Sequence, residues 1–302
     1  MIRTTLRDAL ASERPLVTPL AHDALSARLI ERAGFPAYTV GGSALLAARH
    51  ALPDLGLIGL TDMAEGLRDI AAATTLPFFA DGDDGYGDVK AVVRMVETYE
   101  SIGVGGILIE DQLRQAKQQR AERARGVAPR EVIAAKLAAA LAARRSRDTL
   151  IIGRTDAFGV HGLDEALRRG EAFLELGCDG VFIAGVKSLD DYERIGTRLR
   201  GALLSAALFE GPDMPWPDPA VLGNLGFGHV SFPASLIFRV AAAMVDTLAR
   251  LRAHATGGAA FASDPHAPDQ RGLLDEALDV ARWQGIERRF AAAPAPSASD
   301  AP

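Results

Sequence analysis

Short apolar runs alternate along the chain with longer segments in which apolar residues recur every three or four positions. The short runs are rich in β-branched and aromatic residues and show no polar–apolar alternation, which is typical of strands buried on both faces of a parallel sheet. They predict eight strands, at residues 16–21, 37–41, 77–81, 106–111, 150–155, 180–184, 202–207 and 229–233.

The longer segments predict helices between these strands. In residues 88–103 four valines and Tyr99 fall on one side of the helix, and Gly103 ends it. Similar spacing predicts helices at 23–34, 163–177 and 233–255. Eight strands with a helix after most of them predict an α/β fold of the closed (β/α)₈ barrel type, although a doubly wound open sheet has the same periodicity.

The composition changes after the predicted barrel of residues 1–256. The next segment is rich in small and polar residues and indicates a linker, and residues 271–290 predict an amphipathic helix. The Ala/Pro/Ser-rich residues 291–302 predict a disordered tail.

Composition and charge narrow the class of protein. Of the 302 residues, 48% are apolar and 24% are charged, which is ordinary for a soluble globular protein. The net charge of −6 gives no reason to expect a nucleic-acid partner. No apolar run is long enough to span a membrane, and the N-terminus lacks a signal-peptide core, so we expect a cytoplasmic protein. The only cysteine, Cys178, excludes an intramolecular disulfide and is expected to be structural.

Candidate chemistry gathers where the predicted strands end. Asp81 and Asp83, in "FFADGDDGYGD", follow the third strand, and Glu110 ends the fourth. In a barrel the C-terminal ends of all strands open onto one face, so these carboxylates would meet there. Carboxylate oxygens suit Mg²⁺. The alternative is a solvated Asp/Gly turn.

Three further features accompany these acids. Arg154, at the end of the fifth strand, can hold a substrate carboxylate through two parallel hydrogen bonds, pair with a nearby acid, or do both. His22 and His229 are expected to be packed and hydrogen-bonded rather than catalytic. The polar, basic residues 112–128 are long for a barrel connection and indicate either a functional lid or a disordered insertion.

The segments "LPDLG" (52–56), "DGDDGYGD" (81–88) and "IEDQ" (109–112), in this order, resemble the isocitrate lyase/phosphoenolpyruvate mutase superfamily. The resemblance covers about residues 16–250, together with the terminal helix. It implies a (β/α)₈ barrel whose last helix is exchanged between the subunits of a homodimer or homotetramer. It also implies a Mg²⁺ site, with Mn²⁺ as an alternative, and a small 2-oxo or 2-hydroxy acid as substrate.

The resemblance also implies roles for individual residues. Asp81 and Asp83 match the metal-binding aspartates, and Glu110 matches the acid that holds the metal through water. The catalytic set that it implies comprises Arg154 as the substrate arginine, Lys117 near the lid-lysine position, Glu110, and Asp54 as a further acid. The residues that match the substrate-carboxylate loop are Tyr38, Gly41, Gly42 and Ser43.

The segment after "IEDQ" departs from the superfamily pattern. Members that cleave isocitrate or methylisocitrate carry a Lys-[Lys/Arg]-Cys-Gly-His lid whose cysteine is the proposed acid, and this chain has "LRQAKQQRAERARG" there. The Pro-Lys-x-Asn-Ser lid of phosphonate-forming mutases is absent too, and "FIAGV" replaces the usual glutamate after the sixth strand. Oxaloacetate decarboxylases of the superfamily also lack the cysteine.

These features favour a Mg²⁺-dependent carbon–carbon lyase or decarboxylase that acts on a small di- or tricarboxylate through an enolate, with oxaloacetate-type decarboxylation as the simplest version. One alternative is phosphorus–carbon bond chemistry of the mutase or phosphonopyruvate hydrolase type. Another is a catalytically lapsed barrel that binds a metabolite.

Overall fold

The computed structural model describes residues 4–117, 126–211, 215–258 and 265–291. The chain divides into two compact units, Met1–Val245 and Asp246–Pro302. The predicted tail lies almost wholly outside the described residues, as does the middle of the predicted lid.

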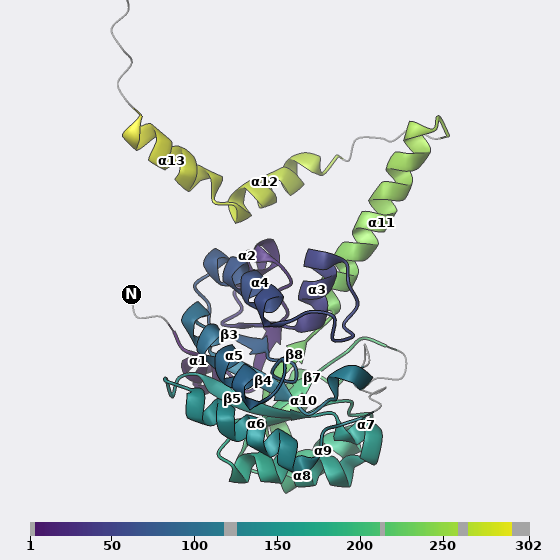
Figure 1. The fold of residues 1–302 in the computed structure, drawn as a ribbon. Coiled ribbons are helices and arrows are strands. Elements are labelled where there is room, and N and C mark those ends of the chain that lie inside the picture. Colours follow the sequence, from purple (N-terminus) through teal and green to yellow (C-terminus); the bar gives the residue numbers. More distant parts are fainter. Residues whose placement is uncertain (1–3, 118–125, 212–214, 259–264, 292–302) are drawn as a thin grey trace, which may run out of the picture. The chain divides into compact units, whose positions relative to one another are not determined.

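Eight parallel strands form one sheet in the first unit (Figure 1). Neighbours follow the order β1-β8-β7-β6-β5-β4-β3-β2, and a parallel bridge between Leu20 and Thr39 joins the two end strands. The predicted (β/α)₈ barrel is therefore confirmed, and the doubly wound alternative is wrong. The strands are β1 (Leu16–Pro19), β2 (Tyr38–Val40), β3 (Phe78–Asp81), β4 (Gly106–Glu110), β5 (Leu150–Thr155), β6 (Gly180–Ile183), β7 (Leu203–Ala207) and β8 (Phe227–Phe232).

Helices follow the strands, and two of them, α2 and α5, show how the sequence sets their ends. Asp23 and Asp88 accept hydrogen bonds from first-turn N–H groups of α2 and α5, and Gly103 ends α5 in the left-handed conformation at φ 93°. The helices of this unit are α1 (Leu6–Ser12), α2 (Ala24–Arg32), α3 (Gly42–His50), α4 (Leu60–Ala73), α5 (Val89–Ile102), η1 (Arg114–Ala116), α6 (Arg130–Ala143), α7 (Ala157–His161), α8 (Leu163–Glu175), α9 (Leu189–Arg198) and α10 (Pro219–Asn224). A further helix, α11 (Ser235–Ala255), spans the boundary between the units.

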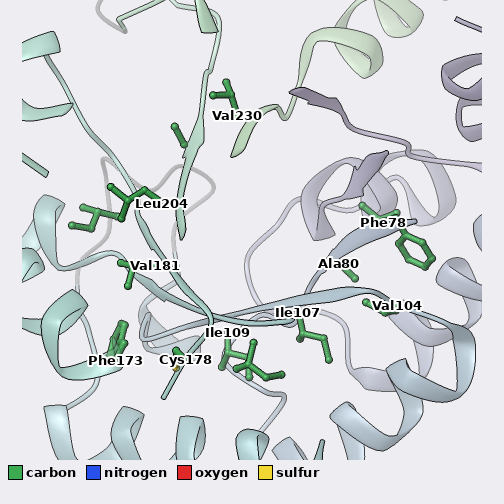
Figure 2. Packing of buried hydrophobic residues seen from close by; sticks show 14 of the residues in the cluster. Phe78, Ala80, Val104, Ile107, Ile109, Phe173, Cys178, Val181, Leu204 and Val230 are labelled. Atoms are coloured by element: carbon green, nitrogen blue, oxygen red, sulfur yellow. The ribbon is translucent and has the colours of Figure 1, made fainter. Parts of the chain in front are cut away.

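The outward-facing strand residues form the larger hydrophobic core. Ile107, Ile109 and Val181 belong to it together with Phe173 of α8 and the buried Cys178 (Figure 2). Burial raises the pKa of the Cys178 thiol to about 12, which fits the predicted structural role.

Residues of the opposite strand face fill the barrel interior. Phe79, Ile152 and Phe182 form a second cluster with Leu6 of α1. Side chains alternate along a strand, so the inward-facing residues that come next are Asp81 after Phe79 and Arg154 after Ile152. The alternation thus sets a charged layer at the C-terminal end of the strands on top of an apolar interior.

The second unit corrects one prediction. Residues 271–290 form two helices, α12 (Ala267–Ala277) and α13 (Val280–Phe290), because Asp279 adopts the left-handed conformation at φ 56° and ends the first. Part of the predicted linker is therefore helical. In the described residues of the chain, no helix is both long and apolar enough to cross a membrane.

Candidate active site

The turn after β3 carries two of the predicted metal aspartates. Asp83 adopts the left-handed conformation at φ 51°, which Asp tolerates better than most residues. Its N–H donates to Asp81 Oδ1 (3.0 Å), and its carbonyl accepts from the Glu110 N–H (2.8 Å). The Gly42 N–H donates to Asp81 Oδ2 (3.2 Å), and a Cβ at position 42 would lie only 3.3 Å from that oxygen. The turn is thus joined to β4 and to the start of α3.

The Lys117 side chain lies among three of the predicted acids. Its ammonium is within 3.1 Å of Asp54 Oδ1 and 3.3 Å of Glu110 Oε1, and it donates a hydrogen bond to Asp83 Oδ1. The Lys117 side chain is only 6% exposed. Acids up to 56 positions apart in sequence, Asp54 and Glu110, therefore share one cation, as the barrel prediction required.

Burial and charge shift the pKa values in this cluster in different directions. Burial alone would lower the pKa of Lys117, but Glu110, Asp83 and Asp54 raise it well above its usual range. Burial raises the pKa of Glu110 well above its usual value although Arg154 and Lys117 oppose this, and burial also raises the pKa of Asp54. For Asp83 the effect of burial is outweighed by Lys117, so its pKa is lowered. Lys117 therefore stays charged and stabilises the carboxylate of Asp83.

Arg154 lies at the inner face of β5, opposite Glu110 in the register with β4. One terminal nitrogen is 2.9 Å from Glu110 Oε2, and the guanidinium forms a fork with Asp156, with Nε–Oδ2 and Nη2–Oδ1 distances of 3.1 Å. Its other neighbour is the ring of Phe182, 5.5 Å away. Pairing with nearby acids, one of the two predicted roles of Arg154, is confirmed.

Arg114 joins this cluster although no sequence motif indicates it. Its guanidinium lies 3.1 Å from Asp83 Oδ2, donates to Asp84 Oδ1, and also donates to the carbonyl of Ile58 (3.1 Å). Lys136 of α6 holds Asp84 from the other side, with Nζ 2.7 Å from its carbonyl oxygen. Asp84 thus contacts both of these cations. The start of the predicted lid, which contains Arg114, is therefore held against the acidic segment that follows β3.

The chemistry of this cluster fits a divalent cation. Six carboxylates face four cationic side chains, which leaves two formal negative charges: Asp54, Asp81, Asp83, Asp84, Glu110 and Asp156 against Arg114, Lys117, Lys136 and Arg154. A cavity of about 10 Å³, the room of one water molecule, is lined by Asp54, Asp81, Asp83 and Lys117. Within the described residues, however, no three acids, histidines or cysteines are arranged as a ready metal site. The ammonium of Lys117 lies among the oxygens of Asp54, Asp83 and Glu110.

The remaining predicted residues fall in different places. Gly41 caps α3, and Ser43 lies in its first turn, beside Gly42. Tyr38 points away from the acids into the outer core, where it stacks on Phe78 at 4.9 Å, because its position on β2 faces outward. His229 is buried and hydrogen-bonded to Thr18 (2.8 Å) and Ser205 (3.1 Å), as expected of a packed histidine.

These features define a class of protein: a (β/α)₈ barrel with an acidic, arginine-bearing mouth. The chain matches the family model described as phosphoenolpyruvate phosphomutase over residues 6–261. It is 35% identical to 2,3-dimethylmalate lyase of Eubacterium barkeri over 82% of this chain and 85% of that protein. It is 37% identical to oxaloacetate decarboxylase of Bradyrhizobium sp. over 64% of this chain and 66% of that protein.

Solved structures agree with this assignment. A structure of oxaloacetate acetylhydrolase with the inhibitor 3,3-difluorooxalacetate matches with a TM-score of 0.86 and 27% identity, covering 97% of this chain and 98% of that one. Phosphonopyruvate hydrolase in complex with oxalate and Mg²⁺ matches with a TM-score of 0.80 and 29% identity, covering 95% and 98%. The chain belongs to the phosphoenolpyruvate phosphomutase family, within the isocitrate lyase/phosphoenolpyruvate mutase superfamily.

Proposed function

We propose that this protein is a Mg²⁺-dependent carbon–carbon lyase or decarboxylase for a small 2-oxo or 2-hydroxy di- or tricarboxylate, of which oxaloacetate is the simplest. The observation that carries the proposal is the meeting of Asp81, Asp83 and Glu110 with Arg154 at the barrel mouth. The relatives named after dimethylmalate and oxaloacetate support the substrate class.

In this proposal the acids bind the metal, and Arg154 and backbone N–H groups bind the substrate anion. Asp81 and Asp83 would hold the metal directly and Glu110 through water, since hard oxygen donors suit Mg²⁺. When bound, Mg²⁺ acts as a Lewis acid on the 2-oxo oxygen. Arg154 would bind a substrate carboxylate with the part of its guanidinium that Asp156 leaves open, and the N–H groups at the start of α3 would bind the same anion.

The rest of the cluster would exclude water from the reacting bond. Lys117 and Arg114 already connect the segment after β4 to the acids of two other loops. Cleavage of oxaloacetate to pyruvate and CO₂ needs no thiol, because the electron pair of the broken bond moves towards the 2-oxo oxygen and water can supply the proton. The missing lid cysteine is therefore compatible with this reaction.

Phosphorus–carbon chemistry is the second candidate, and the position of Lys117 favours it. A lysine turned into the site beside Arg154 would suit a phosphonate, which carries more charge than a carboxylate. The matching phosphonopyruvate hydrolase structure supports the same candidate.

A turnover screen with and without Mg²⁺ tests these candidates. The substrates would be oxaloacetate, methylisocitrate, isocitrate, dimethylmalate and phosphonopyruvate, and the assays would follow pyruvate, glyoxylate, oxalate and phosphate release. We expect Mg²⁺-dependent pyruvate from one of the carboxylates, lost in Asp83→Ala. Phosphate release would instead support the second candidate.

The matched control for Asp83→Ala is Asp88→Ser, in the same turn. Asp88 caps α5 and serine keeps that cap, so this variant should retain full turnover. Silence with every substrate, together with Mg²⁺-dependent binding of oxalate, would favour a metabolite-binding barrel without turnover.

We also propose that the chain self-associates through its C-terminal helices. α11, α12 and α13 expose many large apolar side chains, including Val245 at 68%, Leu273 at 64% and Phe290 at 70%. Exposed apolar surface of this kind marks association sites. Truncation after residue 256 should give a monomer in sedimentation velocity, and an unchanged sedimentation coefficient per chain mass would contradict this.

A further inference from the structure

The carboxylate of Asp156 is fully buried directly beside Arg154. It accepts from both Nε and Nη2 of the guanidinium at 3.1 Å, so it fixes the plane of the group as well as its position. A single point contact would leave the guanidinium free to turn about its long side chain.

Asp156 is itself fixed by a second buried acid. The backbone N–H of Asp156 donates to Asp111 Oδ1 (2.9 Å). The other oxygen of Asp111 accepts from Thr155 Oγ1 (2.6 Å) and from Arg169 Nη1 (2.9 Å). Contacts therefore run without a break from Arg169 on α8, through Asp111 at the end of β4, to Asp156 and Arg154 at the end of β5.

Arg169 also reaches the segment that returns from the predicted lid. Its Nη1 donates to the Ala128 carbonyl (2.8 Å), and the Ala128 N–H donates to the Asp111 carbonyl (2.7 Å). Arg169 and Asp111 thus fix Ala128, where that segment returns to the barrel. Through the backbone of Asp156 they also fix the acid that holds Arg154.

Burying two carboxylates behind Arg154 costs folding free energy. Asp111 and Asp156 are both fully buried, and burial with the charge of Asp156 raises the pKa of Asp111. Recognition of a carboxylate requires a guanidinium held within roughly 0.5 Å of its productive position, which the two acids can provide.

We propose that Asp156, locked by Asp111, is a positioning residue that presents the guanidinium of Arg154 to a substrate carboxylate. This rests on the proposed function, in which Arg154 binds that carboxylate.

Oxalate binding in the presence of Mg²⁺, measured by calorimetry on the full chain, tests the inference. Asp156→Asn keeps the size of the side chain and removes its charge. We expect it to weaken oxalate binding by about 10- to 100-fold, the loss typical when an orienting group behind a ligand is removed. If Asp156 acted only through its charge, the variant would bind the anion more tightly, so tighter or unchanged binding would overturn the inference.

Asp179→Asn is the matched control. Asp179 pairs with the buried Arg144 and accepts from the Ile151 N–H (2.9 Å) at the other end of β5. This variant should melt at a lower temperature and bind oxalate as the wild type does. Equal weakening in both variants would mean that the effect is structural and would overturn the inference.

Two more variants complete the design. Thr155→Val removes the hydrogen bond to Asp111 and the one that Thr155 Oγ1 accepts from the Ala157 N–H. It should weaken oxalate binding at least about threefold, which gives a test if Asp156→Asn does not fold. Arg154→Met should abolish binding. If the wild type and Arg154→Met bind equally, or neither binds, the proposed role of Arg154 fails. If binding depends on Arg154 but not on Asp156 or Thr155, the positioning role alone fails.

Discussion

The two ends of strand β5 each hold a carboxylate against arginines, the half-buried Asp179 at one end and the buried Glu110 at the other, and the two acids are hydrogen-bonded to different degrees. At the N-terminal end, Asp179 receives the Ile151 N–H (2.9 Å), Arg7 (2.7 Å) and Arg144. At the mouth, neither oxygen of Glu110 receives a hydrogen bond of good geometry from any described residue, and its ion partners are Arg154 and Lys117.

The difference separates a stabilising end from a reactive end. A carboxylate with N–H donors and arginines on both oxygens fixes loops at little electrostatic cost. Glu110 keeps a raised pKa because burial outweighs its two cations, and such perturbed groups cluster at functional sites. The presence of ion pairs alone would not distinguish the two ends of β5, whereas the hydrogen bonding of their acids does.

Removing the arginine at the stabilising end should have the largest effect on stability. Arg144→Met leaves the half-buried Asp179 with fewer donors and removes the hydrogen bond to the Thr149 carbonyl, and it should lower the free energy of unfolding by about 3 kcal/mol. Urea denaturation measures this. Added Mg²⁺ should not restore the loss, and a loss below about 1 kcal/mol would contradict the role assigned to this end.

Removing the lysine at the reactive end should give a smaller loss that a metal can repair. Lys117→Met leaves Asp54, Asp83 and Glu110 without their shared cation, so unfolding should become easier by about 1–3 kcal/mol. Mg²⁺ at a hundredfold excess over its Kd should stabilise the folded variant by about 2.7 kcal/mol. At one fixed Mg²⁺ concentration the variant should gain more than the wild type, because no ammonium competes with the metal for the same oxygens.

Thermal melting with and without Mg²⁺ measures this repair. The control is Lys90→Met, at an exposed lysine beside the turn that follows β3. This variant should be stabilised by Mg²⁺ as much as the wild type is. If Mg²⁺ stabilises Lys117→Met less than the wild type, then Lys117 supports metal binding rather than substituting for the metal.

His229, in the barrel interior, should make the free energy of unfolding depend on pH. Burial lowers the pKa of His229 to about 3, whereas an unfolded histidine titrates near about 6.5. Between these values the unfolded chain binds the extra proton, so this contribution to stability is complete above about pH 6.5 and is lost as the pH falls towards 3.

His229→Asn removes this titration while keeping polar groups near Thr18 and Ser205. The free energy of unfolding of the wild type should fall more steeply on acidification, by up to about 1.4 kcal/mol per pH unit, than that of the variant. Urea titrations at several pH values compare the two slopes. Parallel slopes would mean that His229 takes up its proton in the folded protein at the same pH as in the unfolded chain, and would contradict this prediction.

The sequence predicted most of the barrel and the charges of its mouth. All eight strands lie within one or two residues of their predicted bounds, because strands buried on both faces leave unbroken apolar runs. Asp81, Glu110 and Arg154 converge because each ends a parallel strand. The break at Asp279 was missed because neither glycine nor proline marks it.

The network behind the site was harder to predict from sequence. Asp111 and Asp156 were visible at strand ends, but a buried acid and a solvated one look alike in sequence. Arg169 did leave a signal, since it lies among Ala166, Gly170 and Phe173 on the buried side of α8. A charged residue in such a position needs a partner. Which acid serves as that partner depends on the tertiary packing.

The smallest expected effect compares two aspartates within the turn that follows β3. Asp88 lies outside the cluster and caps α5 through the N–H groups of Lys90 (3.0 Å) and Ala91 (3.3 Å). Asp88→Ala should therefore lower the melting temperature by about 2–4 °C, because one helix loses its cap, and should leave Mg²⁺ and oxalate binding unchanged. Asp83→Ala should instead weaken Mg²⁺ and oxalate binding, because it removes a proposed metal ligand, and it should also lower the melting temperature, because Lys117 and Arg114 lose a shared partner. Calorimetry on both variants separates the two roles. Weakened metal binding in Asp88→Ala would mean that the acidic turn acts as one charged surface rather than as a site with a defined edge.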